Sequence, residues 1–163
     1  MAKNDIKFKD AGVTLKAVEW QTEANATAIL GGEPVKLKAT GSPYVIPLAD
    51  AEPVIGTTTR VVGIAAGPSS QTASADGTVM VYELDPTMVL RVKAKTAASV
   101  NTAAEILALC GDNKLMDLTT GVYTVDEAAA NAAANGIVII GGDPVTQELY
   151  FQFRASALQG PIA

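Results

Sequence analysis

The sequence contains no histidine and only one cysteine, Cys110, and each shortage excludes a class of site. Without histidine there is no Ser-His-Asp triad, no Cys-His pair and none of the common histidine-containing zinc sites. A single cysteine cannot form a disulfide within the chain, so packing or association must hold the fold together. We therefore expect Cys110 to be a small buried residue in a protein that is not an enzyme and uses no metal or cofactor.

Charged residues make up only 18% of the chain and aromatic residues 5%, so the core must consist largely of the aliphatic residues within the 48% that are hydrophobic. The net charge of −5 gives no general attraction to phosphate backbones or anionic lipid, and we expect no direct contact with nucleic acid. The start is positively charged, but no apolar stretch follows it, and no later run approaches the roughly 18 apolar residues of a membrane helix. We expect a cytosolic product with no cleaved signal and no membrane association.

Short apolar runs separated by Gly, Pro, Asp and Ser dominate from Gly31 onward, which predicts a mostly β fold. The expected strands are residues 35–39, 44–47, 53–56, 60–65, 78–84, 88–94, 121–125, 137–140 and 148–154. The last two form a hairpin across a Gly-Gly-Asp-Pro turn. The polar loop 67–77 is long enough to project from the body.

At most one or two short helices are expected. Residues 103–110 are ambiguous, because Thr102 and Glu105 have the spacing of a capping box whereas the apolar run before Gly111 also suits a strand, which we favour slightly. Residues 126–132 are predicted to form one or two helical turns.

Four segments follow from these patterns: an N-terminal arm or edge segment at 1–30, a first β module at 31–96, a second at 97–156, and a C-terminal tail at 157–163. The two modules share a weak internal similarity. Gly-Gly-Glu-Pro at 31–34 and Gly-Gly-Asp-Pro at 141–144 would each place a glycine turn beside a strand. Neither continues into a phosphate-binding motif, so both are interpreted as turns.

The charged residues do not select a catalytic pair. No spacing singles out two of the aspartates, which are expected to be solvated turn residues: Asp10, Asp50, Asp76, Asp112, Asp117 and Asp143. Basic residues alternate within strand-like segments: Lys7, Lys9, Lys36, Lys38, Arg91, Lys93 and Lys95. Each set would lie on one face of its strand, either as a solvated outer surface or as a basic strip facing an acidic support.

Three stretches resemble the capsid decoration, or cement, proteins of tailed bacteriophages. They are Gly-Glu-Pro-Val-Lys-Leu at 32–37, Val-Gly-Ile-Ala at 62–65 with the loop and strand that follow it to 81, and 121–126 with the hairpin 137–153. The resemblance covers about residues 30–155. It implies small β-barrel or β-tulip modules, often trimeric, with no catalytic residues.

The resemblance also implies a function and a place. The protein would bind the major capsid protein on the outer surface of the head, between capsomers, and stabilise the shell against the pressure of packaged DNA. It would be made in the host cytoplasm, reside on the capsid exterior, and form a homo-oligomer, with a trimer favoured. The alternatives are another self-assembling phage subunit, such as a minor head or tail tube protein, and a ligand-binding β-barrel.

The N-terminal segment supplies the candidate partner-binding residues. Its apolar side chains could lie along a neighbouring subunit as an added strand. These residues are Ile6, Phe8, Val13, Leu15 and Trp20. Trp20, the only tryptophan, is either an anchor of the core, which we favour, or an anchor of an interface.

Overall fold

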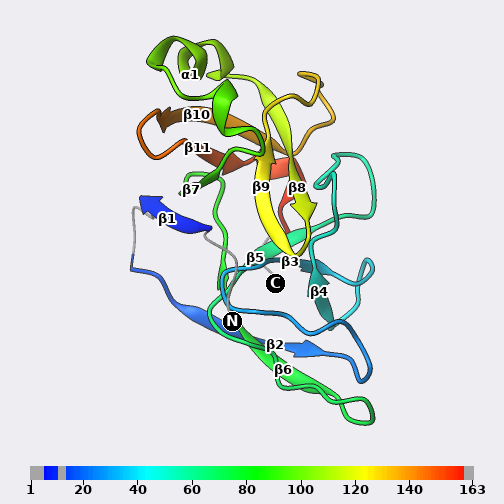
Figure 1. Cartoon of the computed structure of the whole chain (residues 1–163). Helices are drawn as coiled ribbons and strands as arrows, with labels where there is room; N and C mark the ends of the chain where they lie inside the picture. Colours follow the sequence, from blue (N-terminus) through cyan, green and yellow to red (C-terminus); the bar gives the residue numbers. More distant parts are fainter. Residues whose placement is uncertain (1–5, 11–13, 160–163) are drawn as a thin grey trace.

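The computed structural model describes residues 6–10 and 14–159, and these residues form a mostly β structure of two antiparallel sheets. Figure 1 shows the six-stranded sheet above the five-stranded sheet. The six-stranded sheet contains, in spatial order, β1 (Lys7–Asp10), β7 (Val89–Lys93), β11 (Glu148–Phe153), β10 (Ile137–Asp143), β8 (Asn113–Thr119) and β9 (Val122–Asp126). The five-stranded sheet contains β2 (Ala17–Thr22), β6 (Gly77–Glu83), β5 (Val61–Ala65), β3 (Pro34–Leu37) and β4 (Val45–Pro47).

Both sheets curl so that strands far apart in the sheet order touch. In the five-stranded sheet Gln21 of β2 forms a single bridge to Tyr44, next to β4. In the six-stranded sheet Ala94, just after β7, forms a single parallel bridge to Val125 of β9. Neither contact is a continuous ladder, so the sheets are open and neither is a closed barrel.

The buried side chains form two clusters that follow this curvature. The smaller cluster lies inside the five-stranded sheet and includes Trp20, Val35 and Val81. The larger one fills the six-stranded sheet and continues to the junction, where Val61 and Ile64 of β5 contribute to it. Strand β5 is buried along its whole length because it lies between the two clusters and contributes residues to both.

The connection between β4 and β5 joins the sheets through backbone hydrogen bonds. Its Ala51 N–H donates to the carbonyl of Met116 at 3.0 Å, and the Met116 N–H donates to the Glu52 carbonyl at 2.8 Å. Further along, the N–H of Gly136 donates to the carbonyl of Pro53 at 2.9 Å. We call residues 48–55 the connecting segment.

The predicted strand at 103–110 is wrong, because residues Ala103–Leu109 form the helix α1. The Thr102 hydroxyl accepts from the Glu105 N–H, and the Glu105 carboxylate accepts from the Thr102 N–H, so the capping box decides the ambiguity. Ile106 is the buried residue of this short helix. Cys110 follows the helix and is exposed, which corrects its predicted burial.

Three further predictions need correction. Residues 126–132 form the end of β9, a turn and a loop in place of helical turns, and residues 53–56 make one isolated bridge, at Val54, in place of a strand. Strand β8 was not predicted. The predicted hairpin of 137–140 with 148–154 is confirmed as β10 and β11, which pair in antiparallel register. Its predicted Gly-Gly-Asp-Pro turn is wrong, because Gly141, Gly142 and Asp143 pair within β10 and the turn is 144–147.

The sheets do not divide the chain at residue 96. Strand β7 lies before that position and belongs to the six-stranded sheet, next to β11. The predicted arm is also shared, since β1 is an edge strand of one sheet and β2 an edge strand of the other. Whether the protein consists of two modules remains a prediction. Two single-turn 3-10 helices, η1 (Ala97–Ser99) and η2 (Ala155–Ala157), complete the described elements.

Candidate interaction face

The predicted partner-binding residues differ in what the structure leaves accessible. Ile6 is buried in the larger cluster and Trp20 in the smaller one, where its indole N–H donates to a Glu83 carboxylate oxygen at 3.0 Å. Phe8 and Leu15 are half-buried at the rim of the larger cluster. Val13 lies outside the described residues. The role of these residues in binding a partner remains a prediction, but only Phe8 and Leu15 of the described four retain substantial exposure.

Phe8 meets the five-stranded sheet at Tyr82. The two rings are perpendicular, with centroids 5.8 Å apart, so an aromatic contact closes the rim between β1 and β6. Strand alternation places Met80 on the same face of β6 as Tyr82, two residues further from the junction, and its side chain is 42% exposed. Val18 of the neighbouring edge strand β2 is 37% exposed, but it is in register with Val81 and therefore lies on the other face of this sheet.

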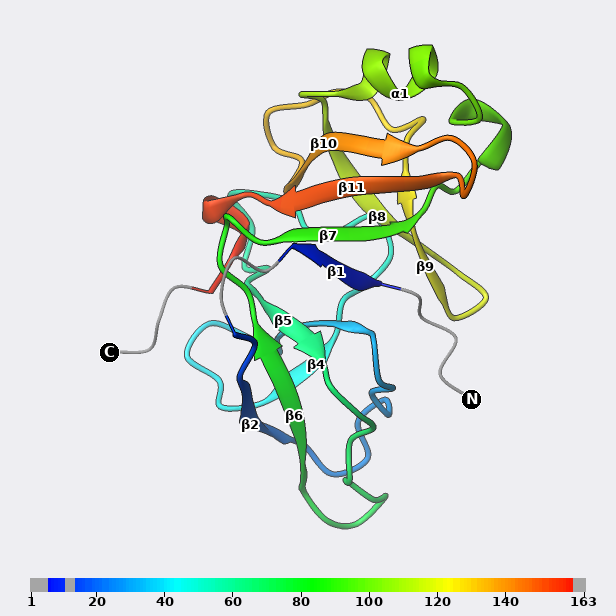
Figure 2. The same cartoon turned by 90° about the vertical axis from the view of Figure 1, so that its left-hand side faces the viewer.

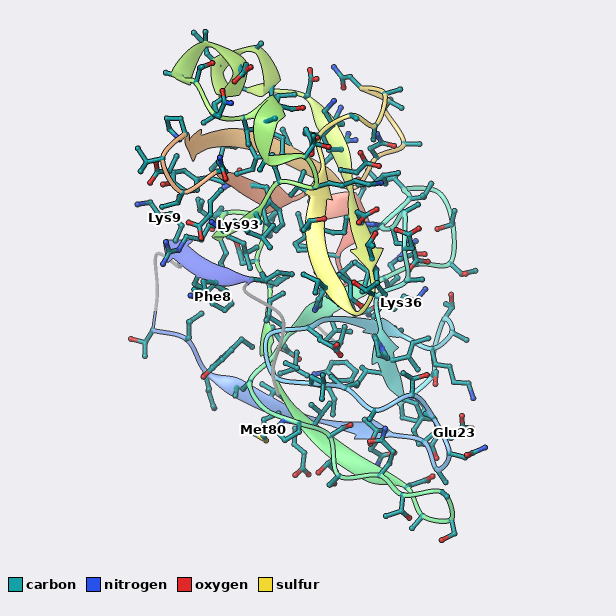
Figure 3. The ribbon with its side chains drawn as sticks, in the orientation of Figure 1. Phe8, Lys9, Glu23, Lys36, Met80 and Lys93 are labelled. Carbon is teal, nitrogen blue, oxygen red and sulfur yellow. The ribbon has the colours of Figure 1, made fainter. Side chains whose placement is uncertain are left out.

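Phe8, Tyr82 and Met80 lie on the side of the molecule that carries the N-terminal strands. In Figure 2, β1 lies toward the viewer with β6 and β2 below it. In Figure 3 the labelled side chains of Phe8 and Met80 lie on the corresponding side. We define the N-terminal face as Phe8, Leu15, Met80 and Tyr82.

Two of these four residues, Met80 and Tyr82, were missed from the sequence. The run Val79-Met80-Val81-Tyr82 is apolar or aromatic at every position, so the pattern cannot say which alternate residues face the core. The structure buries Val79 and Val81 and leaves Met80 exposed. Locating the face required the sheet order and the register, which show the side of β6 that the smaller cluster leaves uncovered.

A cluster of lysines borders the N-terminal face on the outer surface of the six-stranded sheet. Lys7 is in register with Arg91 of β7, and Arg91 with Tyr150 of β11, which places all three on one face. The Lys9 ammonium lies over the Tyr150 ring, 5.1 Å from its centroid. Lys93 is exposed and its ammonium contacts the Thr146 carbonyl. Figure 3 shows Lys9 and Lys93 on the same side as Phe8.

Five other basic residues are paired with carboxylates. The pairs are Lys36–Glu52, Lys38–Glu23, Arg91–Glu148, Lys95–Asp117 and Lys114–Asp112. Within the described residues no ion pair involves Lys7, Lys9 or Lys93, although the charge of Lys9 helps to lower the pKa of Asp143. Of the alternating basic residues, those on β3 and its end thus form ion pairs, whereas those on β1 do not.

The aspartates considered for acid-base chemistry serve as hydrogen-bond acceptors for loops and strand ends. The N–H of Ala24 and the hydroxyl of Tyr44 donate to Asp76, each at 2.8 Å, and hold the pKa of its carboxyl below the usual range. The backbone N–H of Val145 lowers the pKa of Asp143 in the same way. Asp50 accepts from the N–H of Leu118 at 2.9 Å.

Asp112 and Asp117 are also engaged. Asp112 accepts from the Asn131 amide at 2.9 Å and pairs with Lys114. Burial by itself would raise the pKa of Asp117, but hydrogen bonds from Lys95 and Thr119 outweigh it and lower that pKa. Asp10 ends β1, and its side chain lies outside the described part. Across residues 6–10 and 14–159 no group of three or more Cys, Asp or Glu side chains is placed to hold a metal ion.

An open groove of about 470 Å³ lies on another part of the surface, between β4 and the end of β8. Ile46, Pro47 and Leu118 supply its apolar lining. The ion pair between Lys38 and Glu23 supplies polar lining. The groove is therefore a mixed surface depression at which the two sheets meet.

Comparison of the chain with known protein families, with curated proteins and with solved structures gives no match. Among the described residues, no helix has the length and apolar character needed to cross a bilayer. The candidate site consequently rests on the geometry of the chain itself.

Proposed function

We propose that the protein is a structural decoration, or cement, protein of a tailed-phage head and not an enzyme. In this proposal it binds the major capsid protein on the outside of the shell, between capsomers, as a small homo-oligomer with a trimer favoured. The observation that carries the proposal is the N-terminal face, where the exposed side chain of Met80 continues the apolar rim of Phe8 and Tyr82 near the open edge of β1. Apolar surface at an exposed sheet edge is typical of a site that another chain covers.

The curled sheets support the proposal because the resemblance implies barrel-like or tulip-like modules. A two-sheet body with a bonded connecting segment is suited to transmit load between neighbouring capsomers. The energetic argument is mass action: a protein that binds only the assembled shell lowers the free energy of that shell relative to its dissociated subunits. Attachment of each oligomer at several points adds avidity without requiring any single strong contact.

The open edge of β1 provides backbone groups for a partner. Within the described chain β1 pairs only with β7, so its other side offers N–H and C=O groups to an added strand. This differs from a free arm, because Ile6 and Trp20 hold the flanking segments in the two cores. Removal of residues 1–20 would take away part of both cores, so single substitutions on the face are the appropriate test.

The proposal is tested by co-sedimentation with heads of the encoding phage from which this protein has been stripped. Met80→Gln should reduce binding of the purified protein to these heads, because it places a polar amide in the covered interface. Val145→Gln is the matched control, since Val145 is also apolar, is 88% exposed and lies on the β10–β11 turn. Failure of the wild-type protein to bind, or equal loss with both variants, would refute the assignment of this face.

Size-exclusion chromatography of the purified protein separates the proposal from the alternative of a self-assembling head or tube subunit. A decoration protein should elute as a small closed oligomer, whereas a tube-forming subunit should give open polymers.

A further inference from the structure

We infer that Lys7, Lys9 and Lys93 form a docking strip for an acidic patch on the folded shell protein. This inference rests on the proposed function and adds the chemistry of the partner surface. The strip belongs to β1 and β7, neighbouring strands of the six-stranded sheet, and all three side chains are exposed. Adjacent strands lie about 4.8 Å apart, so the three amines can contact a single small patch on the partner.

None of the three lysines of the strip forms an ion pair within the described protein. The charge of Lys9 acts on Asp143 only from a distance, where it helps to lower the pKa of that carboxyl, and the Lys93 ammonium is directed to a neutral carbonyl, that of Thr146. Asp143 and Glu148 are the acidic residues of the adjacent hairpin. Asp143 accepts turn N–H groups, and Glu148 pairs with Arg91.

The arrangement of β1 matches the anatomy of a protein interface. Phe8 is directed toward the rim of the core and Tyr82, whereas Lys7 is on the opposite, outward side of the strand. The Tyr150 ring lies beside the Lys9 ammonium and limits its freedom through a cation–π contact. An apolar centre at the N-terminal face with a charged border on the neighbouring strands resembles the apolar core and polar rim of known interfaces.

Charge complementarity identifies the partner as an acidic protein surface. A strip of three amines on a chain with net charge −5 can match a local acidic patch. An extended polyanion such as nucleic acid would instead meet the negative charge of the remaining surface. The same argument predicts that attachment weakens as salt rises, because exposed charges are screened over a Debye length of about 8–10 Å.

The test compares two double variants with the same change in charge. Lys7→Gln/Lys9→Gln removes two amines from the strip, and Lys38→Gln/Lys95→Gln removes two lysines that are each 43% exposed and paired elsewhere. Binding to the stripped heads is measured by co-sedimentation from about 50 to about 500 mM salt, a range over which screening becomes strong. Thermal melting confirms that each variant is folded.

We expect the strip variant to bind about tenfold more weakly at low salt and to show a flatter salt dependence. The control should stay within about twofold of the wild type. Equal weakening by both variants, or none by the strip variant, would overturn the strip while leaving the proposed function intact.

Two further measurements test other partners that could bind the lysine strip in place of the shell protein. If wild-type protein does not bind heads, the proposed function and the shell partner both fail. Analytical sedimentation of the free protein then shows whether the strip binds a second copy, as lysine-dependent self-association at low salt would indicate. A gel shift with duplex DNA that is lost in the Lys7→Gln/Lys9→Gln variant would likewise contradict an acidic protein partner.

Discussion

The ring of Phe8 meets the ring of Tyr82 edge-on at 5.8 Å between centroids, although the two residues belong to different sheets. Phe8 is on the edge strand β1, and Tyr82 is on β6 of the five-stranded sheet. Both are half-buried, so the pair closes the rim of the shared core without being enclosed by it. The contact therefore stabilises the junction between the two sheets, and it also lies within the proposed interaction face.

A double-mutant cycle should detect this contact. Phe8→Leu and Tyr82→Leu each retain apolar bulk, but either removes the aromatic pair, so the two effects on the free energy of unfolding should not add. We expect a coupling of about 0.5–1.5 kcal/mol, the range for edge-to-face aromatic pairs. Urea denaturation of the four proteins measures it. Additive effects would show that the rings contribute only through their separate burial.

The sequence was sufficient for elements whose local pattern agrees with their tertiary environment. Residues 137–140 and 148–154 are apolar runs, and they form the predicted hairpin, although Gly141 and Gly142 extend the first strand and the turn itself is 144–147. It was insufficient for α1, where the apolar run Ile106–Leu109 suited a strand and the capping hydrogen bonds of Thr102 decided otherwise. The strand β8 was hidden because its charged residues Lys114 and Asp117 are buried through partners on other elements.

The candidate face shows the same limit. Phe8 and Leu15 could be proposed from the N-terminal pattern, but the exposure of Met80 depends on which side of β6 the core covers. The pairing of Lys38 with Glu23 and the lack of such a partner at Lys7 among the described residues likewise depend on tertiary neighbours. Alternation predicts which lysines share a face, whereas only the fold shows which are neutralised.

Gly63 should be intolerant of a side chain. A Cβ atom at this position of the buried strand β5 would lie 2.1 Å from the Tyr82 carbonyl oxygen, so β5 and β6 would have to separate. We expect Gly63→Ala to lower the free energy of unfolding by about 1–3 kcal/mol or more, the cost of overpacking. Gly67→Ala is the control, because a Cβ there meets no atom within 4 Å. Thermal and urea denaturation distinguish them, and equal stability of the two variants would refute the steric argument.

The ion pair between Lys95 and Asp117 should make the free energy of unfolding depend on pH. The distance from the Lys95 ammonium to an Asp117 oxygen is 2.7 Å, and the folded-state pKa of Asp117 is lowered. A lowered carboxyl pKa contributes stability above the unfolded value of about 3.9, and the contribution is lost as pH falls through the folded pKa. Urea midpoints between about pH 7 and 2.5 should therefore fall more steeply for wild type than for Asp117→Asn at the acidic end. Parallel curves would exclude Asp117 as a contributor.

Among the polar residues of the connecting segment, Glu52 should cause the largest loss of unfolding free energy when it is substituted. Its carboxylate accepts from the Lys36 ammonium at 2.6 Å, from the Thr59 hydroxyl at 3.0 Å and from the Ala49 N–H at 2.8 Å. Glu52→Gln removes the charge and leaves a half-buried ammonium without its partner, which should cost about 1–3 kcal/mol of unfolding free energy. Glu23→Gln, which breaks the more exposed pair with Lys38, should cost less than about 1 kcal/mol.

The position of Glu52 also predicts which backbone amides should lose protection from hydrogen exchange when it is substituted. Its own carbonyl accepts the Met116 N–H, and the adjacent Pro53 carbonyl accepts the Gly136 N–H. Loosening the connecting segment should therefore accelerate amide hydrogen exchange at Met116 and Gly136 in the six-stranded sheet region, while leaving Gly32, whose N–H donates to the Ala65 carbonyl, near its wild-type rate. Uniform acceleration at all three amides would instead indicate a global loss of stability. Adding Lys36→Met to Glu52→Gln should recover part of the loss, because it removes the unpaired ammonium that the single substitution leaves behind.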